Sequence, residues 1–267
     1  MEVLWELVKP MPSNMGTPNV TDDVLLGLAF MVVIAFADFV LLRNVFKFMV
    51  DDKNGRYFTL HVAINAYVVL VHFDDVYYAI TDPWGSVFWP CDNRGIIAIA
   101  ALHLYHIGFY QPLPAVDWVH HIIMIIILLP TAYLLQPGPM LGEGAFWASG
   151  LPGGIDYLML VLVKAGKMNS LTEKSWNTTI QTWIRMPGCL YHAFVSWAAL
   201  MRLVGMPYDP ASPRLPYALL PDHMLPITIC LMITVVGFFW NGPYFAARVV
   251  ASHAVHTERK KLAAKAK

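Results

Sequence analysis

Charged residues are scarce in this sequence. Asp, Glu, Lys and Arg together make up 13% of its 267 residues, whereas hydrophobic residues make up 57%. A soluble domain usually has about 25% charged residues, so this chain has too few to cover a surface in contact with water. That scarcity excludes an ordinary soluble globular protein. The formal net charge is zero, which leaves no general basic field for nucleic acid, and we expect no nucleic-acid partner.

Cysteine is also rare. The three cysteines are Cys91, Cys189 and Cys230, and no two of them form a C-x-x-C pair. Such wide spacing excludes a disulfide framework and a zinc ribbon, and we expect no metal site and no bound cofactor. Residues 1–20 lack the basic start and apolar core of a cleaved signal peptide. We therefore expect the first apolar segment itself to direct insertion into a membrane.

Long apolar runs are what the sequence has in abundance. A helix that crosses a bilayer needs about 20 mostly apolar residues. We predict seven such spans, at about 24–46, 57–80, 95–110, 117–136, 146–163, 179–203 and 224–249. Each must be helical, because unpaired backbone groups are too costly in lipid. The sequence thus predicts an all-α, polytopic transmembrane bundle over residues 23–250, with an N-terminal segment (1–22) before it and a basic tail (251–267) after it.

The distribution of lysine and arginine predicts how the bundle is oriented. Basic residues gather after the first, fifth and seventh spans, and cytosolic loops are the ones that carry such an excess. These residues are Arg43, Lys47, Lys53 and Arg56; Lys164, Lys167 and Lys174; and Arg248, Arg259, Lys260, Lys261, Lys265 and Lys267. Only an odd number of spans puts all three groups on one side. We therefore predict a lumenal or external N-terminus and a cytosolic C-terminus.

Histidines are concentrated inside the predicted spans. Those that fall within them are His61, His72, His103, His106, His120, His121 and His192. Ionisable residues are costly in a membrane and mark a functional site by default. The alternating direction of the spans predicts one polar layer near the inner face, with His192 deeper. The residues of this layer are His61, His106, Asp117, His120, His121 and Arg185.

The fourth predicted span opens with a carboxylate close to two histidines. Asp117 precedes His120 by three residues and His121 by four, so all three can lie on one helical face. A carboxylate beside histidine raises its basicity, as a general base requires. Asn65 follows His61 by four residues, which places both on one face of the second span. The alternative, that these groups only form hydrogen bonds between helices, stays open.

The segment Asp117-Trp118-Val119-His120-His121 resembles one in the TLC-domain family of membrane proteins, which includes the ceramide synthases. The likeness extends over about 56–248 and includes Thr81-Asp82-Pro83-Trp84 and the aromatic segment from Phe239 to Phe245. Asp156 followed by Lys164 is similar to a later part of the ceramide synthase motif. Residues 122–133 depart from that motif, because they are almost wholly apolar.

The resemblance implies a protein of lipid or sphingolipid metabolism in the endoplasmic reticulum or another internal membrane. For an enzyme it implies acyl transfer from acyl-CoA, with His120 or His121 as base and Asp117 orienting it. Lipid-binding candidates are His61, Asn65, His106, Asp156, Arg185 and His192. Expected partners are membrane lipids and membrane subunits, in a homo- or hetero-oligomer.

Other functions fit the same residues. Within the family, a non-catalytic lipid sensor or carrier is the main alternative, and a structural subunit of a membrane complex is another. From a different class, His103-x-x-His106 with His120-His121 is similar to the histidine sets of metal-dependent membrane oxygenases. Those enzymes need more histidines at tighter spacing, which disfavours that reading.

Overall fold

The structure is a computed structural model that describes residues 20–85, 92–135, 140–204 and 224–265. Every regular element within these ranges is a helix, and they contain no strand. The prediction of an all-α protein is therefore confirmed. Cys91 and almost all of the predicted N-terminal segment lie outside the described residues.

Several helices are continuous with π-helical segments, which carry the label η. In chain order the elements are α2 (Val20–Phe36), η1 (Ala37–Val45), α3 (Lys53–Val71), α4 (Phe73–Thr81), α5 (Arg94–Phe109), α6 (Ala115–His120), η3 (His121–Leu128), α7 (Leu129–Leu135), α8 (Met140–Ala145), η4 (Phe146–Gly150), α9 (Leu151–Lys164), α10 (Ser170–Ile180), η5 (Gln181–Arg185), α11 (Met186–Val204) and α12 (Met224–Lys265). Adjoining elements form long rods, and a rod covers most or all of each stretch predicted as a span.

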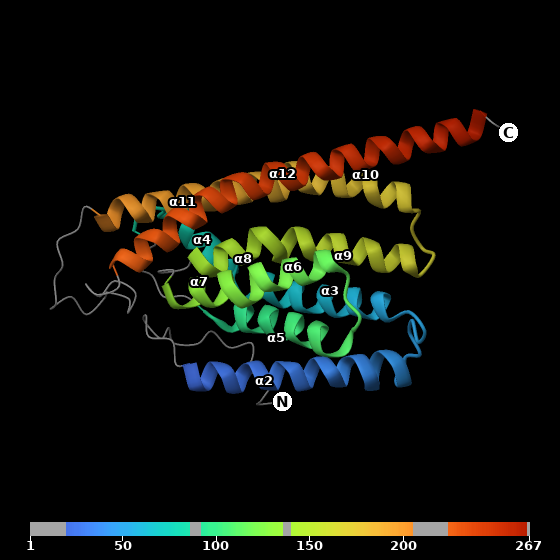
Figure 1. Cartoon of the computed structure of the whole chain (residues 1–267), viewed down its shortest axis with the longest axis horizontal. Helices are drawn as coiled ribbons and strands as arrows, with labels where there is room; N and C mark the ends of the chain where they lie inside the picture. The colour runs from blue at the N-terminus through green and yellow to red at the C-terminus, as the bar shows by residue number, and fades with distance from the viewer. Residues whose placement is uncertain (1–19, 86–91, 136–139, 205–223, 266–267) are drawn as a thin grey trace.

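The rods lie side by side along the longest axis of the molecule (Figure 1). Helix α2 lies along one side of the bundle, and α10, α11 and α12 lie along the opposite side. Between them, α3 packs against both α5 and α9, while α5 also packs against α2. The C-terminal part of α12 projects beyond the other helices. Predicted site residues on α3, α5 and α9 thus belong to helices that pack against one another inside the bundle.

The outer surface of the bundle is apolar. Among the described helices, three are long and apolar enough to cross a membrane: Val20–Val45, Met140–Lys164 and Leu225–Lys265. Only 17%, 28% and 22% of the residues in their most apolar stretches are buried in the protein. A water-soluble protein would bury these side chains, so their exposure indicates association with a membrane. The count of seven spans and the orientation of the termini stay predictions.

Candidate functional site

Four histidines from three elements meet in the interior. The ring centres of His61 on α3 and His103 on α5 are 5.3 Å apart, and those of His103 and His121 on η3 are 5.2 Å apart. His106, one turn after His103, places its Nδ1 3.0 Å from Nε2 of His121. All four side chains are buried, and we call this group the histidine cluster.

Two tyrosines cover the histidine cluster. The ring of Tyr57 stacks on His106 with 3.8 Å between the ring centres, and Tyr157 stacks on His61 at 4.0 Å. The planes of each pair lie within 11° of parallel. Because Tyr157 belongs to α9, the cluster is bordered by a fourth helix. The aromatic rings shield the imidazoles from bulk water.

The histidine pair of the fourth predicted span is only partly described. His121 lies in the cluster, whereas the side chain of His120 falls outside the described part of the chain. Asp117 is half-buried in the first turn of α6, and its charge acts on the phenols of Tyr57 and Tyr157. Asp117 therefore borders the cluster. Its predicted pairing with His120 and His121 stays a prediction, since the hydrogen-bond partner seen for His121 is His106.

Asn65 lies one turn beyond His61 on α3 and is buried. The hydroxyl of Ser149 donates to Asn65 Oδ1 at 3.2 Å, which ties α3 to η4. A Cβ added at Gly153 would lie 3.2 Å from Asn65 Nδ2, so glycine there lets α9 approach closely. Asn65 thus serves the packing of α3 on the rod that contains α9.

Asp156 and Arg185 belong to a ladder of polar side chains along α10 and η5. Asn177 Nδ2 donates to Asp156 Oδ1 at 2.7 Å, and Gln181 Nε2 donates to Asn177 Oδ1 at 3.2 Å. The Arg185 guanidinium donates to Gln181 Oε1 and to Asn241 Oδ1, each at 3.3 Å. The ladder connects α9, α10 and α12. Because Asp156 immediately precedes Tyr157, the ladder reaches the edge of the histidine cluster.

His192 lies in a separate buried group. Its Nδ1 is hydrogen-bonded to Glu143 Oε2, and nearby His72 Nδ1 is 2.7 Å from Asp75 Oδ2. All four side chains are less than 5% exposed. Glu143 stands between two glycines that face these pairs: a Cβ at Gly142 would overlap both His72 and Asp75, and a Cβ at Gly144 would overlap His192. The sequence interpretation singled out His192 but missed Glu143 as its partner, and it missed the pairing of Asp75 with His72.

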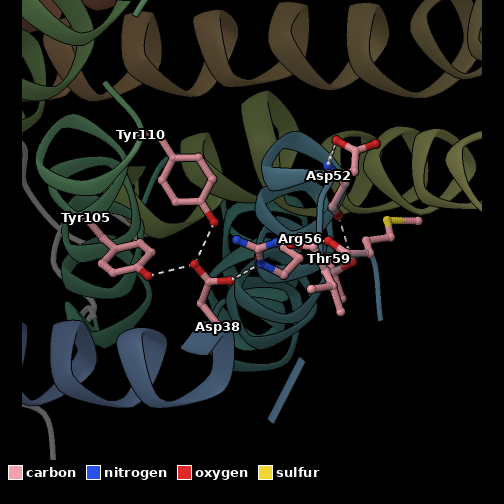
Figure 2. Close-up of polar contacts among 9 residues, drawn as sticks. Asp38, Asp52, Arg56, Thr59, Tyr105 and Tyr110 are labelled. Carbon is pink, nitrogen blue, oxygen red and sulfur yellow. Dashed lines mark hydrogen bonds and ion pairs between the residues drawn. The ribbon is translucent and has the colours of Figure 1, made fainter. Parts of the chain in front are cut away.

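A further buried network was also missed (Figure 2). Arg56 Nε donates to Asp38 Oδ1 at 2.6 Å, and the hydroxyls of Tyr105 and Tyr110 donate to Asp38 Oδ2 at 2.8 and 2.7 Å. Asp38 and Arg56 are 1% and 3% exposed. Arg56 is therefore a structural residue inside the bundle, although the orientation argument counted it with the loop residues. The available signal was an aspartate within the long apolar run of the first span.

The described residues contain no group of three or more histidine, cysteine, aspartate or glutamate side chains arranged to hold a metal ion. Comparisons with known proteins give no further assignment: no protein-family model, no curated protein and no solved structure matches this chain. The resemblance to the TLC-domain family consequently rests on the sequence segments alone.

Proposed function

We propose that this chain is an integral membrane protein with seven spans, a cytosolic C-terminus and a site that acts on lipids. The apolar outer surface supports a membrane location, and the three long apolar helices supply part of the span count. The basic segments favour a cytosolic C-terminus, and the TLC-like motif favours the endoplasmic reticulum or another internal membrane. The reaction that fits best is acyl transfer from acyl-CoA to an amine, as the motif implies.

The hydrogen bond between His106 and His121 carries the proposal. In a bond between two neutral imidazoles, one nitrogen donates and the other accepts, so the protonation of one ring fixes the tautomer of the other. The ring that donates has no hydrogen on its other nitrogen and can accept a proton there. For His121 this requires that Nε2–H donates to His106 Nδ1, which leaves His121 Nδ1 as the base. His121 would take the proton from the amine as the amine nitrogen attacks the thioester carbonyl. The carbon–sulfur bond then breaks, and the proton passes to the departing thiolate of coenzyme A.

The packing around the histidines favours a second candidate, a non-catalytic lipid sensor or carrier. All four imidazoles are buried, and Tyr57 and Tyr157 stack on His106 and His61, so a substrate must displace packed side chains to reach the cluster. If the tyrosines stay in place, the cluster holds α3, α5, η3 and α9 together. Lipid would then be sensed through a change in how these helices pack. The two candidates differ in whether His121 ever meets a reacting atom.

Activity of the purified full-length protein in lipid nanodiscs tests the proposal. The protein is incubated with palmitoyl-CoA and a sphingoid base, and the amide product is measured by mass spectrometry. We expect His121→Gln to lower the rate by about 100-fold or more, the usual contribution of a general base. His256→Gln is the control, because His256 is exposed on the C-terminal part of α12.

Two results would count against catalysis at this site. An unchanged rate in a folded His121→Gln variant would exclude His121 as the base. Absence of product from the wild-type protein, together with His121-dependent retention of lipid during purification, would favour the sensor or carrier. A thermal unfolding curve for each variant separates loss of chemistry from loss of folding.

A further inference from the structure

Arg185 carries a guanidinium that is held by neutral groups. It donates to the amide oxygens of Gln181 and Asn241, both at 3.3 Å, which is long for a charged donor, and it also interacts with the thiol of Cys189. Its carbon lies 4.6 Å from the centre of the Phe245 ring. The Nε atom is shielded from solvent and has no partner among the described residues. A guanidinium has five N–H donors, so Arg185 keeps capacity for another acceptor.

No carboxylate in the described part of the chain forms an ion pair with Arg185. Asp156 is close enough for its charge to act on the guanidinium, but Asp156 Oδ1 accepts the amide of Asn177 at 2.7 Å. A charge inside a membrane protein is costly unless it is paired directly. The site therefore has a cation that neutral side chains hold in place and that forms no carboxylate ion pair within the described residues.

The surroundings indicate what kind of anion can reach Arg185. Trp183, two residues before it, is 75% exposed, and Trp240, beside Asn241, is 58% exposed. Both tryptophans are close to the Arg185 site in the sequence, and their exposed rings belong to the apolar outer surface of the bundle. On the inner side, the charge of Arg185 acts on Tyr157, which stacks on His61 of the histidine cluster. Arg185 thus lies between the lipid-facing surface and that cluster.

We propose that Arg185 binds the acidic group, a carboxylate or a phosphate, of an anionic lipid. The planar fork of a guanidinium matches two oxygens of either group, and Gln181 and Asn241 hold the fork in position. The bound acid would extend its apolar chain into the lipid around the bundle. The inference rests on the proposed function only in taking a lipid as the ligand, because it needs no chemical step.

Binding to the full-length protein in a non-ionic detergent tests this inference. The probes are oleate and dioleoyl phosphatidate, and their uncharged counterparts are oleyl alcohol and dioleoylglycerol. Affinity is measured by native mass spectrometry and by the shift in melting temperature. We expect at least one acidic probe to stabilise the wild-type protein more than its uncharged counterpart. Arg185→Gln should weaken that binding by about tenfold or more, and Arg185→Lys by less.

The control is Arg248→Gln, which removes a positive charge from α12 at a position where Arg248 lies 5.7 Å from the Tyr244 ring centre. It should bind the acidic probes as the wild type does, since general attraction to anions is not the cause. Binding of oleate alone identifies a carboxylate ligand, and binding of phosphatidate alone identifies a phosphate ligand. Equal affinity of wild type and Arg185→Gln would overturn the inference, as would equal stabilisation by acidic and uncharged probes.

The outcome is separable from that of the proposed function. His121→Gln removes the base but leaves the guanidinium and its amide partners in place, so it should bind the acidic probe normally. Absence of acyl transfer by the wild-type protein, with intact Arg185-dependent binding, would refute only the reaction. If Arg185→Gln does not fold, the wild-type comparison of acidic and uncharged probes and the Arg185→Lys affinity decide the question.

Discussion

Removing the Asp38 carboxylate should destabilise the bundle strongly. In Asp38→Ala the Arg56 guanidinium stays buried without its ion-pair partner, a change that usually costs about 3–5 kcal/mol. Arg56 Nη1 still donates to the carbonyls of Met49 and Val50, at 2.9 and 2.6 Å, so we expect a loss of about 3 kcal/mol. Removing both charges in Asp38→Leu/Arg56→Met should cost less than the sum of the two single changes, because neither charge is left unpaired.

The free energy of unfolding, measured by denaturant titration in detergent micelles, checks this reasoning. The control is Lys164→Met, which removes a surface ion pair with Asp52 at 2.9 Å, where both side chains are more than a third exposed. Exposed pairs contribute at most about 1 kcal/mol. If Asp38→Ala costs no more than Lys164→Met, or if the double variant costs as much as the two single changes together, the buried network does not have the role assigned to it.

Two other expectations follow from packing and topology. Gly142→Ala should lower the melting temperature or prevent folding, because its Cβ would overlap Asp75 and His72. Gly108→Ala should be nearly neutral, since nothing lies within 4 Å of a Cβ there. Comparable unfolding temperatures for the two variants would contradict the packing argument. Protease treatment of sealed vesicles should digest a C-terminal tag on the cytosolic side and leave an N-terminal tag protected, and two tags accessible on one side would contradict an odd number of spans.

The helices could be predicted from the sequence because lipid leaves the backbone few alternatives. Apolar runs indicated the positions of the rods, and the first, predicted at 24–46, is observed at Val20–Val45. Polar helical segments were not predicted. Helix α10 (Ser170–Ile180) has a polar composition that is typical of a loop, and α12 continues through the charged tail to Lys265. Alanine, lysine and arginine favour helix without any apolar periodicity, which explains the extension.

The pairing of polar side chains could be predicted much less well than their presence. A sequence shows which histidines share a helix, such as His103 and His106, but His106 bonds to His121 and His192 bonds to Glu143 through contacts between helices. Those contacts depend on how the rods rotate about their axes. The spacing of Asp117 and His121 predicts a local pair, which stays a prediction, but it gave no sign of the hydrogen bond between His121 and His106 of α5.

The π-helical segments explain why α-helical spacing did not predict which face of each helix points into the bundle. A π-helix bonds each residue to the fifth along the chain, so one such turn shifts every following side chain around the axis. Each π-helical segment in the described residues contains a polar side chain of the interior networks: Asp38 in η1, His121 in η3, Ser149 in η4 and Arg185 in η5. Such turns are rare in proteins overall, and those that do occur often lie at functional sites. The same local distortion that aims these side chains inward also breaks the periodicity from which their direction would have been predicted.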